Sequence, residues 1–102
     1  MTKLELNDRL ANLYAQVRTL GYVDGFTRLG KPIVIQKLFI DDWNRLMPLA
    51  LSNKIGIEAM NNIVLAGRDD IGSKASYSDH ETIEAAAQYA IAMALVKLAE
   101  SK

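Results

Sequence analysis

The stretch of residues 85–96 is apolar except for Gln88. On a helix its large side chains do not gather on one face, because Ile91 points to one side and Met93 to the other. A helix that is apolar all round must be buried all round. The stretch is also shorter than the roughly 20 residues that a membrane span needs. We therefore expect the last helix to be either the central rod of a small bundle or the seam between copies of the chain.

The composition fits a single domain over residues 1–102 and limits its partners. The chain contains twelve Lys and Arg, twelve Asp and Glu, and no Cys. Proteins that bind nucleic acid usually carry a basic excess, so the neutral charge argues against a nucleic-acid partner. The absence of cysteine excludes disulfides and thiolate metal sites. No secretory signal or membrane segment is expected, and the cytoplasm is the expected location.

The first helix is predicted from its capping and its apolar spacing. Thr2 and Glu5 fit a capping box, in which two side chains satisfy the free backbone amides of a helix start. Apolar residues follow at helical spacing as far as Val17, and Gly21 is suited to end the helix. Over residues 22–36 this periodicity stops. A minor β-hairpin, lying against the helices, is expected there at most.

Three further helices are predicted in the rest of the chain. One covers residues 38–53, with a kink or a break into two short helices near Met47 because of Pro48, and another covers residues 57–66. Residues 67–77 are expected to form a polar loop, after which the last helix begins at Ser78. The predicted fold class is therefore all-α, a small bundle of about four helices with a possible minor hairpin between the first two.

His80 and Glu84 lie four residues apart, a helical spacing that can hold one metal ion. This pattern loosely resembles the acidic helices of all-α nucleotide pyrophosphatases, which hold magnesium with two paired-carboxylate motifs on facing helices. The resemblance implies a metal-dependent enzyme, but the second motif is missing because Glu5 already serves as a cap. Ser78 and Glu81 explain the same segment as a second capping box. We therefore expect a capped helix start there, with no metal site and no cofactor.

Residues 63–74 superficially match a phosphate-binding loop, with an apolar run followed by Gly67 and Gly72. Such a loop needs its lysine directly after the second glycine, so that the ammonium group reaches the phosphates. Ser73 stands at that position in this chain. We therefore expect a helix end and a solvated loop in this segment.

The segment of residues 21–32 is the best candidate for a binding site. Tyr22 and Phe26 offer aromatic faces, and Arg28 and Lys31 are suited to bind an anion or a carboxylate. Loops carry function more often than cores do. The alternative is a simple connection whose aromatic side chains plug into the bundle.

Small residues along the last helix favour self-association. Alanines spaced four apart let a second helix approach closely, and only three short helices are available to cover this one. We therefore expect a homo-oligomer, most simply a dimer. Residues 28–37 contain three basic residues and no acid, whereas residues 69–84 contain five acids and one lysine. Such complementary segments would steer self-association, although ordinary solvated faces are the default interpretation. The predicted interface consists of Ala86, Tyr89, Ala90, Met93 and Ala94.

These features predict a small non-enzymatic interaction protein that binds a protein partner as a homo-oligomer. Accessory, adaptor and inhibitor proteins of bacteria and phages often have this size. The alternative function is binding of a small anionic ligand or nucleotide, with the site in residues 21–32. A metal-dependent nucleotide pyrophosphatase is the third hypothesis.

Overall fold

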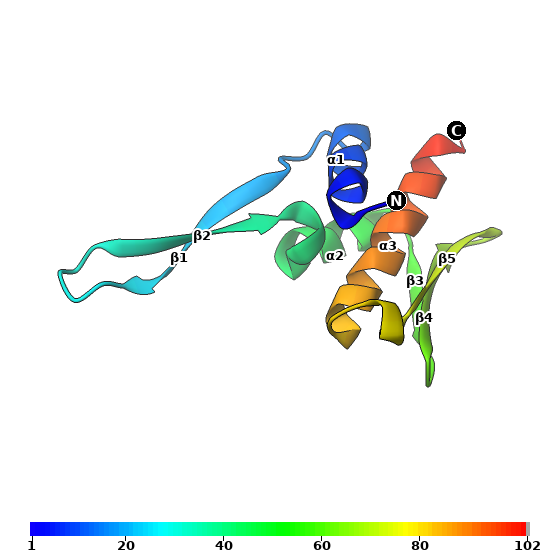
Figure 1. Ribbon diagram of the computed structural model, residues 1–102. Coiled ribbons are helices and arrows are strands. Elements are labelled where there is room, and N and C mark those ends of the chain that lie inside the picture. The colour runs from blue at the N-terminus through cyan, green and yellow to red at the C-terminus, as the bar shows by residue number, and fades with distance from the viewer. Residues whose placement is uncertain (102) are drawn as a thin grey trace.

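Three α-helices and five β-strands make up the chain in the computed structural model, which describes residues 1–101 (Figure 1). The prediction of an all-α bundle was therefore wrong. The strands form two antiparallel sheets, one of two strands and one of three. In chain order the elements are α1 (Lys3–Leu13), β1 (Thr19–Phe26), β2 (Pro32–Leu38), α2 (Trp43–Ser52), β3 (Gly56–Ala59), β4 (Ile63–Arg68), β5 (Ile71–Ser76) and α3 (Ile83–Glu100).

The last helix, α3, is the middle layer of the body of the molecule (Figure 1). Strands β4 and β5 pack against it, and so do α1 and α2. Ala90, Ile91 and Leu95 are completely buried, as expected for a helix that is apolar all round. The sequence did not reveal that one of its covering layers is a sheet. No helix within residues 1–101 combines the length and the hydropathy needed to cross a bilayer.

The three-stranded sheet occupies the part of the chain where a helix over residues 57–66 and a loop over residues 67–77 were predicted. Both predictions were wrong. Burial alternates along β4, where Val64 and Ala66 are buried while Leu65 between them is half-buried. This period of two is that of a strand with one covered face. The chain then turns back at Asp69, whose φ of 56° is a left-handed conformation that Asp adopts more easily than most residues.

The first helix starts as predicted but ends earlier. The Thr2 hydroxyl accepts a hydrogen bond from the Glu5 N–H at 3.2 Å and donates one to the Glu5 carboxylate at 2.9 Å. The helix ends at Leu13, not close to Gly21. Ala15 adopts the left-handed conformation that terminates it, with φ of 53°. A glycine was expected in that role, so this boundary could not be predicted.

The starts of α2 and α3 were also misplaced. A 3₁₀ turn at Phe39–Asp41 precedes α2, which then continues through Pro48, so the chain breaks before this helix and not within it. The predicted cap at Ser78 was wrong as well. Thr82 caps α3, because its hydroxyl accepts a hydrogen bond from the Ala85 N–H at 3.0 Å.

Strands β1 and β2 form a hairpin that projects away from the body (Figure 1). The molecule measures 54 × 32 × 23 Å and has a radius of gyration of 15.0 Å, whereas a compact chain of this length has about 13 Å. A hairpin in this region was expected to be minor and to lie against the helices. The second part of that expectation was wrong. We call residues 19–38 the arm.

Candidate binding arm

The arm carries apolar side chains on both of its faces. Val23 lies opposite Val34 in the register of the two strands, and Tyr22 lies opposite Ile35. Cross-strand partners share a face and neighbouring residues alternate, so the two pairs lie on opposite faces. On one face Val23 and Val34 are 59% and 55% exposed, and on the other Ile33 and Ile35 are 43% and 36% exposed while Tyr22 is half-buried. Since an antiparallel sheet normally packs one face on a core, an arm with two bare apolar faces is suited to be covered by another molecule.

The tip of the arm combines exposed apolar and basic side chains. Phe26 is 68% exposed and Leu29 is 86% exposed. Arg28 and Lys31, which are also exposed, lie in the same turn. Thr27 closes the turn, because its N–H donates to the Lys31 carbonyl at 2.8 Å and its hydroxyl accepts from the Lys31 N–H at 3.1 Å. Phe26, Arg28 and Lys31 were predicted as site residues, and the structure brings these three together.

The fourth predicted residue, Tyr22, lies nearer the root of the arm, where Arg45 of α2 holds both strands. The Arg45 guanidinium donates from Nη1 to the Val17 carbonyl at 2.9 Å and from Nη2 to the Lys37 carbonyl at 3.4 Å. Val17 precedes β1 and Lys37 belongs to β2. The same guanidinium lies 4.9 Å from the centre of the Phe39 ring, a cation–π contact. One side chain therefore fixes both ends of the hairpin to the body.

Asp42 is the carboxylate that holds Arg45 in place. It is 1% exposed, accepts from Arg45 Nε at 2.9 Å and from the Asn44 N–H at 3.1 Å, and so also caps α2. The Tyr22 hydroxyl donates to the same carboxylate.

Burial alone would raise the pKa of Asp42, but the hydrogen bonds from Tyr22, Arg45 and Asn44 and the charge of Arg45 together hold it below the ordinary value. The hydrogen bond to Asp42 and desolvation raise the pKa of Tyr22. At neutral pH the root therefore contains an anionic Asp42 and a neutral Tyr22.

A second clamp at the root is formed by Asn7 of α1, which is completely buried. Its Nδ2 donates to the Arg18 carbonyl at 3.1 Å, and its Oδ1 accepts from the Ile40 N–H at 2.9 Å. The Phe39 N–H also donates to the Arg18 carbonyl, at 2.8 Å. The residues just before and just after the arm are thus bonded to each other and to the body. Of the three polar residues buried within residues 1–101, two, Asn7 and Asp42, serve this junction, and sequence reasoning singled out neither.

Of the residues predicted as an oligomer interface on α3, the three alanines lie inside this chain. Ala86, Ala90 and Ala94 are completely buried, and Tyr89 and Met93 are half-buried. The Tyr89 hydroxyl also donates to the Met1 carbonyl at 3.0 Å. Because the chain itself covers α3, the burial of this helix gives no reason to expect a second copy.

His80 lies before the first turn of α3, with its ring 4.9 Å from that of Tyr89. The helical spacing between His80 and Glu84 that would suit a metal ion is therefore not formed. Within residues 1–101, no group of three His, Asp or Glu side chains is placed to hold a metal. His80 packs against an aromatic ring, as many histidines do.

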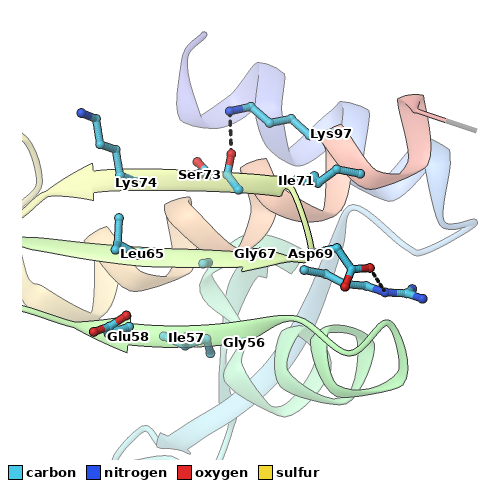
Figure 2. A pocket seen from close by; sticks show the side chains of 13 residues that line it. Gly56, Ile57, Glu58, Leu65, Gly67, Asp69, Ile71, Ser73, Lys74 and Lys97 are labelled. Atoms are coloured by element: carbon cyan, nitrogen blue, oxygen red, sulfur yellow. Dashed lines mark hydrogen bonds and ion pairs between the residues drawn. The ribbon is translucent and has the colours of Figure 1, made fainter.

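An open hollow of about 710 Å³ lies on the three-stranded sheet (Figure 2). Gly56 pairs with Gly67 and Gly67 pairs with Gly72, so three glycines cross the sheet side by side. Gly67 is required by the tight hairpin, since a Cβ there would lie 2.4 Å from the Ile71 carbonyl oxygen. Lys97 of α3 donates to the Gly72 carbonyl at 3.0 Å and covers the edge of β5 (Figure 2). Residues 63–74, which superficially match a phosphate-binding loop, therefore form β4, a turn and the first part of β5.

Comparison of the chain with family models, curated proteins and solved structures finds no match. The function is therefore inferred from the geometry of the arm. This geometry consists of two bare apolar faces, a basic and apolar tip, and a root held by Arg45 and Asn7.

Proposed function

We propose that this protein is a non-enzymatic interaction protein that binds another protein through its arm. The observation that carries the proposal is the exposure of apolar side chains on both faces of a two-stranded hairpin. Full burial of one large apolar side chain contributes about 1.5–3 kcal/mol. Covering Phe26, Leu29 and the two valines of the arm would therefore stabilise a complex strongly.

The fixed root supports the same proposal. A loop that must be ordered on binding loses conformational entropy, which weakens the complex. The arm is ordered beforehand by Arg45 and Asn7, which are bonded to backbone atoms on both sides of it. Binding then requires little ordering of the backbone.

The alternative functions receive less support from the geometry. Sites for small ligands are concave, whereas the segment of residues 21–32 projects from the body (Figure 1). Tyr22 and Asp42, whose pKa values are both shifted, bond to each other, to a helix start and to Arg45. A structural role accounts for all of these contacts, so the cluster does not favour an enzyme.

Site-specific photo-crosslinking in cells that make this protein tests the proposal. A benzophenone amino acid is placed at Phe26 or Leu29 of the arm, and at Leu51, which is 66% exposed on the body, as a control. We expect crosslinks to protein from the two arm positions, and fewer from Leu51. If the arm positions crosslink to no protein, or no more than Leu51 does, the arm is not the binding element and the proposal is wrong.

A further inference from the structure

The arm and the rest of the chain carry opposite charges. Residues 19–38 contain three basic residues, Arg28, Lys31 and Lys37, and one acid, Asp24. The remainder of the chain contains nine basic and eleven acidic residues. The arm is therefore positive and the body negative, which is the arrangement that brings unlike surfaces together.

These charges are not neutralised within the chain. Five ion pairs form among residues 1–101, and none of them includes a basic residue of the arm. The acids Asp79, Glu81 and Glu84 take part in none of these pairs either, and all three are exposed. Ile83, between the last two of them, is 63% exposed. The body thus presents an apolar side chain among acids, and the tip presents apolar side chains beside bases.

The size of the arm suits a reciprocal contact. Stable protein interfaces use about 20–30 residues on each side. The arm supplies 20 residues, and all of them except Tyr22 and Leu38 are exposed. In a dimer with a two-fold axis each copy gives one arm and receives another, so both arms are covered by a single closed assembly.

We propose that the protein bound by the arm is a second copy of this chain. Each arm lies against the body of the other molecule, and Arg28 and Lys31 at its tip face the acidic residues 79–84 of the second copy. Phe26 and Leu29 then pack near Ile83 of that copy. This inference rests on the proposed function, because it names the partner of the same surface.

Reversal of the charges on the arm tip or on the acidic residues 79–84 tests the inference. The molar mass of each protein in solution is measured by sedimentation at about 1–100 µM. The arm variant is Arg28→Glu with Lys31→Glu, and the body variant is Glu81→Lys with Glu84→Lys. We expect the unmodified protein to be a dimer and each variant alone to dimerise at least tenfold more weakly. An equimolar mixture of the two variants should restore dimers, because both contacts in the mixed dimer then join unlike charges. The control variant Arg9→Glu with Lys54→Glu changes the net charge as much as the arm variant and should dimerise normally.

The outcomes separate this inference from the proposed function. A monomer at 100 µM whose arm nevertheless crosslinks to another protein in cells would overturn the second copy as partner and leave the binding arm standing. A monomer that binds duplex DNA through the arm, without crosslinks to protein, would overturn both. A dimer that the body variant does not weaken, such as one made by pairing arm with arm, would overturn the docking of the tip on residues 79–84.

Discussion

A few buried polar side chains determine how the arm is attached. Asp42 caps α2, binds Arg45 and accepts from the Tyr22 hydroxyl, so one carboxylate connects a helix start to β1 directly and to β2 through Arg45. An N-cap Asp is recognisable in a sequence that precedes a helix. Its link to Tyr22, twenty residues earlier, is not, because only the folded chain brings the two together. Sequence analysis therefore named three tip residues and Tyr22, but not Asp42, Arg45 or Asn7, which attach the arm to the body.

Removal of the Asp42 carboxylate should destabilise the whole protein. Breaking a buried ion pair leaves the partner charge uncompensated and typically costs about 3–5 kcal/mol. Arg45 keeps 16% of its side chain exposed, so we expect about 3 kcal/mol for Asp42→Ala, measured by chemical denaturation. The exposed Glu58→Ala should change the free energy of unfolding by no more than about 0.5 kcal/mol. A loss under about 1 kcal/mol for Asp42→Ala would show that the cluster does not hold the root.

The free energy of unfolding should depend on pH partly through the ionisation of Asp42. Its pKa is lower in the folded protein than in the unfolded chain. Its contribution is therefore fully present above the unfolded pKa, about 4, and is lost as the pH falls through the folded value. In Asp42→Asn this part of the acid destabilisation should disappear, so the free energy of unfolding should fall less steeply below pH 4. Parallel curves for the two proteins would contradict the role of the carboxylate.

The start of α3 offers a second test of single side chains. Loss of an N-cap hydroxyl costs about 1 kcal/mol. Thr82→Ala should therefore lower the free energy of unfolding by about that amount, because the Thr82 hydroxyl accepts from the Ala85 N–H. Ser78→Ala should have almost no effect, since the exposed Ser78 hydroxyl hydrogen-bonds to the Ser76 hydroxyl, at 3.0 Å, and does not cap the helix. Thermal denaturation of both variants decides between the observed cap and the one predicted from sequence.

At the scale of whole elements, apolar spacing alone misled the prediction most between residues 56 and 76. Ile57, Met60, Ile63 and Val64 lie at helical intervals, yet they belong to two strands and the turn between them. The turn residues Asn61 and Asn62, and later Asp69, were the available signals, since Asn and Asp are common in tight turns. The last strand of this sheet is rich in small and polar residues, so its strand propensity is weak. Packing against α3 decides the structure of the segment.

The outer part of the arm should be dispensable for folding. Residues 24–33 can be replaced by Asn-Gly, which suits a two-residue turn and would join the paired residues Val23 and Val34. Because the arm packs on the body only near its root, we expect the free energy of unfolding to change by less than about 1 kcal/mol. Thermal denaturation monitored by circular dichroism measures this. A large loss of stability would mean that the outer arm helps to hold the fold.

At the scale of the whole molecule, α3 forms the centre of the core of one chain. The sequence indicated correctly that most of this helix is buried, but could not show whether the cover comes from the same chain or from another. The strands that cover it on one side were mistaken for a helix and a loop, so too few layers were counted. With these strands in place, the case for self-association moves from α3 to the arm.

The variant Ala90→Glu tests whether α3 is covered by its own chain or by a second copy. Ala90 is completely buried within one chain, and an unpaired charge at such a position is strongly unfavourable. We expect this variant to lose its fold, not merely to dissociate into folded monomers. Circular dichroism and sedimentation of the same sample measure both properties. A folded monomer would place Ala90 in an interface after all.

The central position of α3 also sets the order in which the protein can form during translation. The Tyr14 hydroxyl donates to the Leu95 carbonyl at 2.6 Å, so α1 packs on a helix that is synthesised some eighty residues later. The hairpin needs only neighbouring residues and can close while α1 still lacks its partner. During most of its synthesis the nascent chain therefore exposes an apolar arm and an uncovered α1 to the solvent around the ribosome. Chaperones that bind exposed apolar surfaces can therefore bind the nascent chain before residues 83–100 emerge from the ribosome.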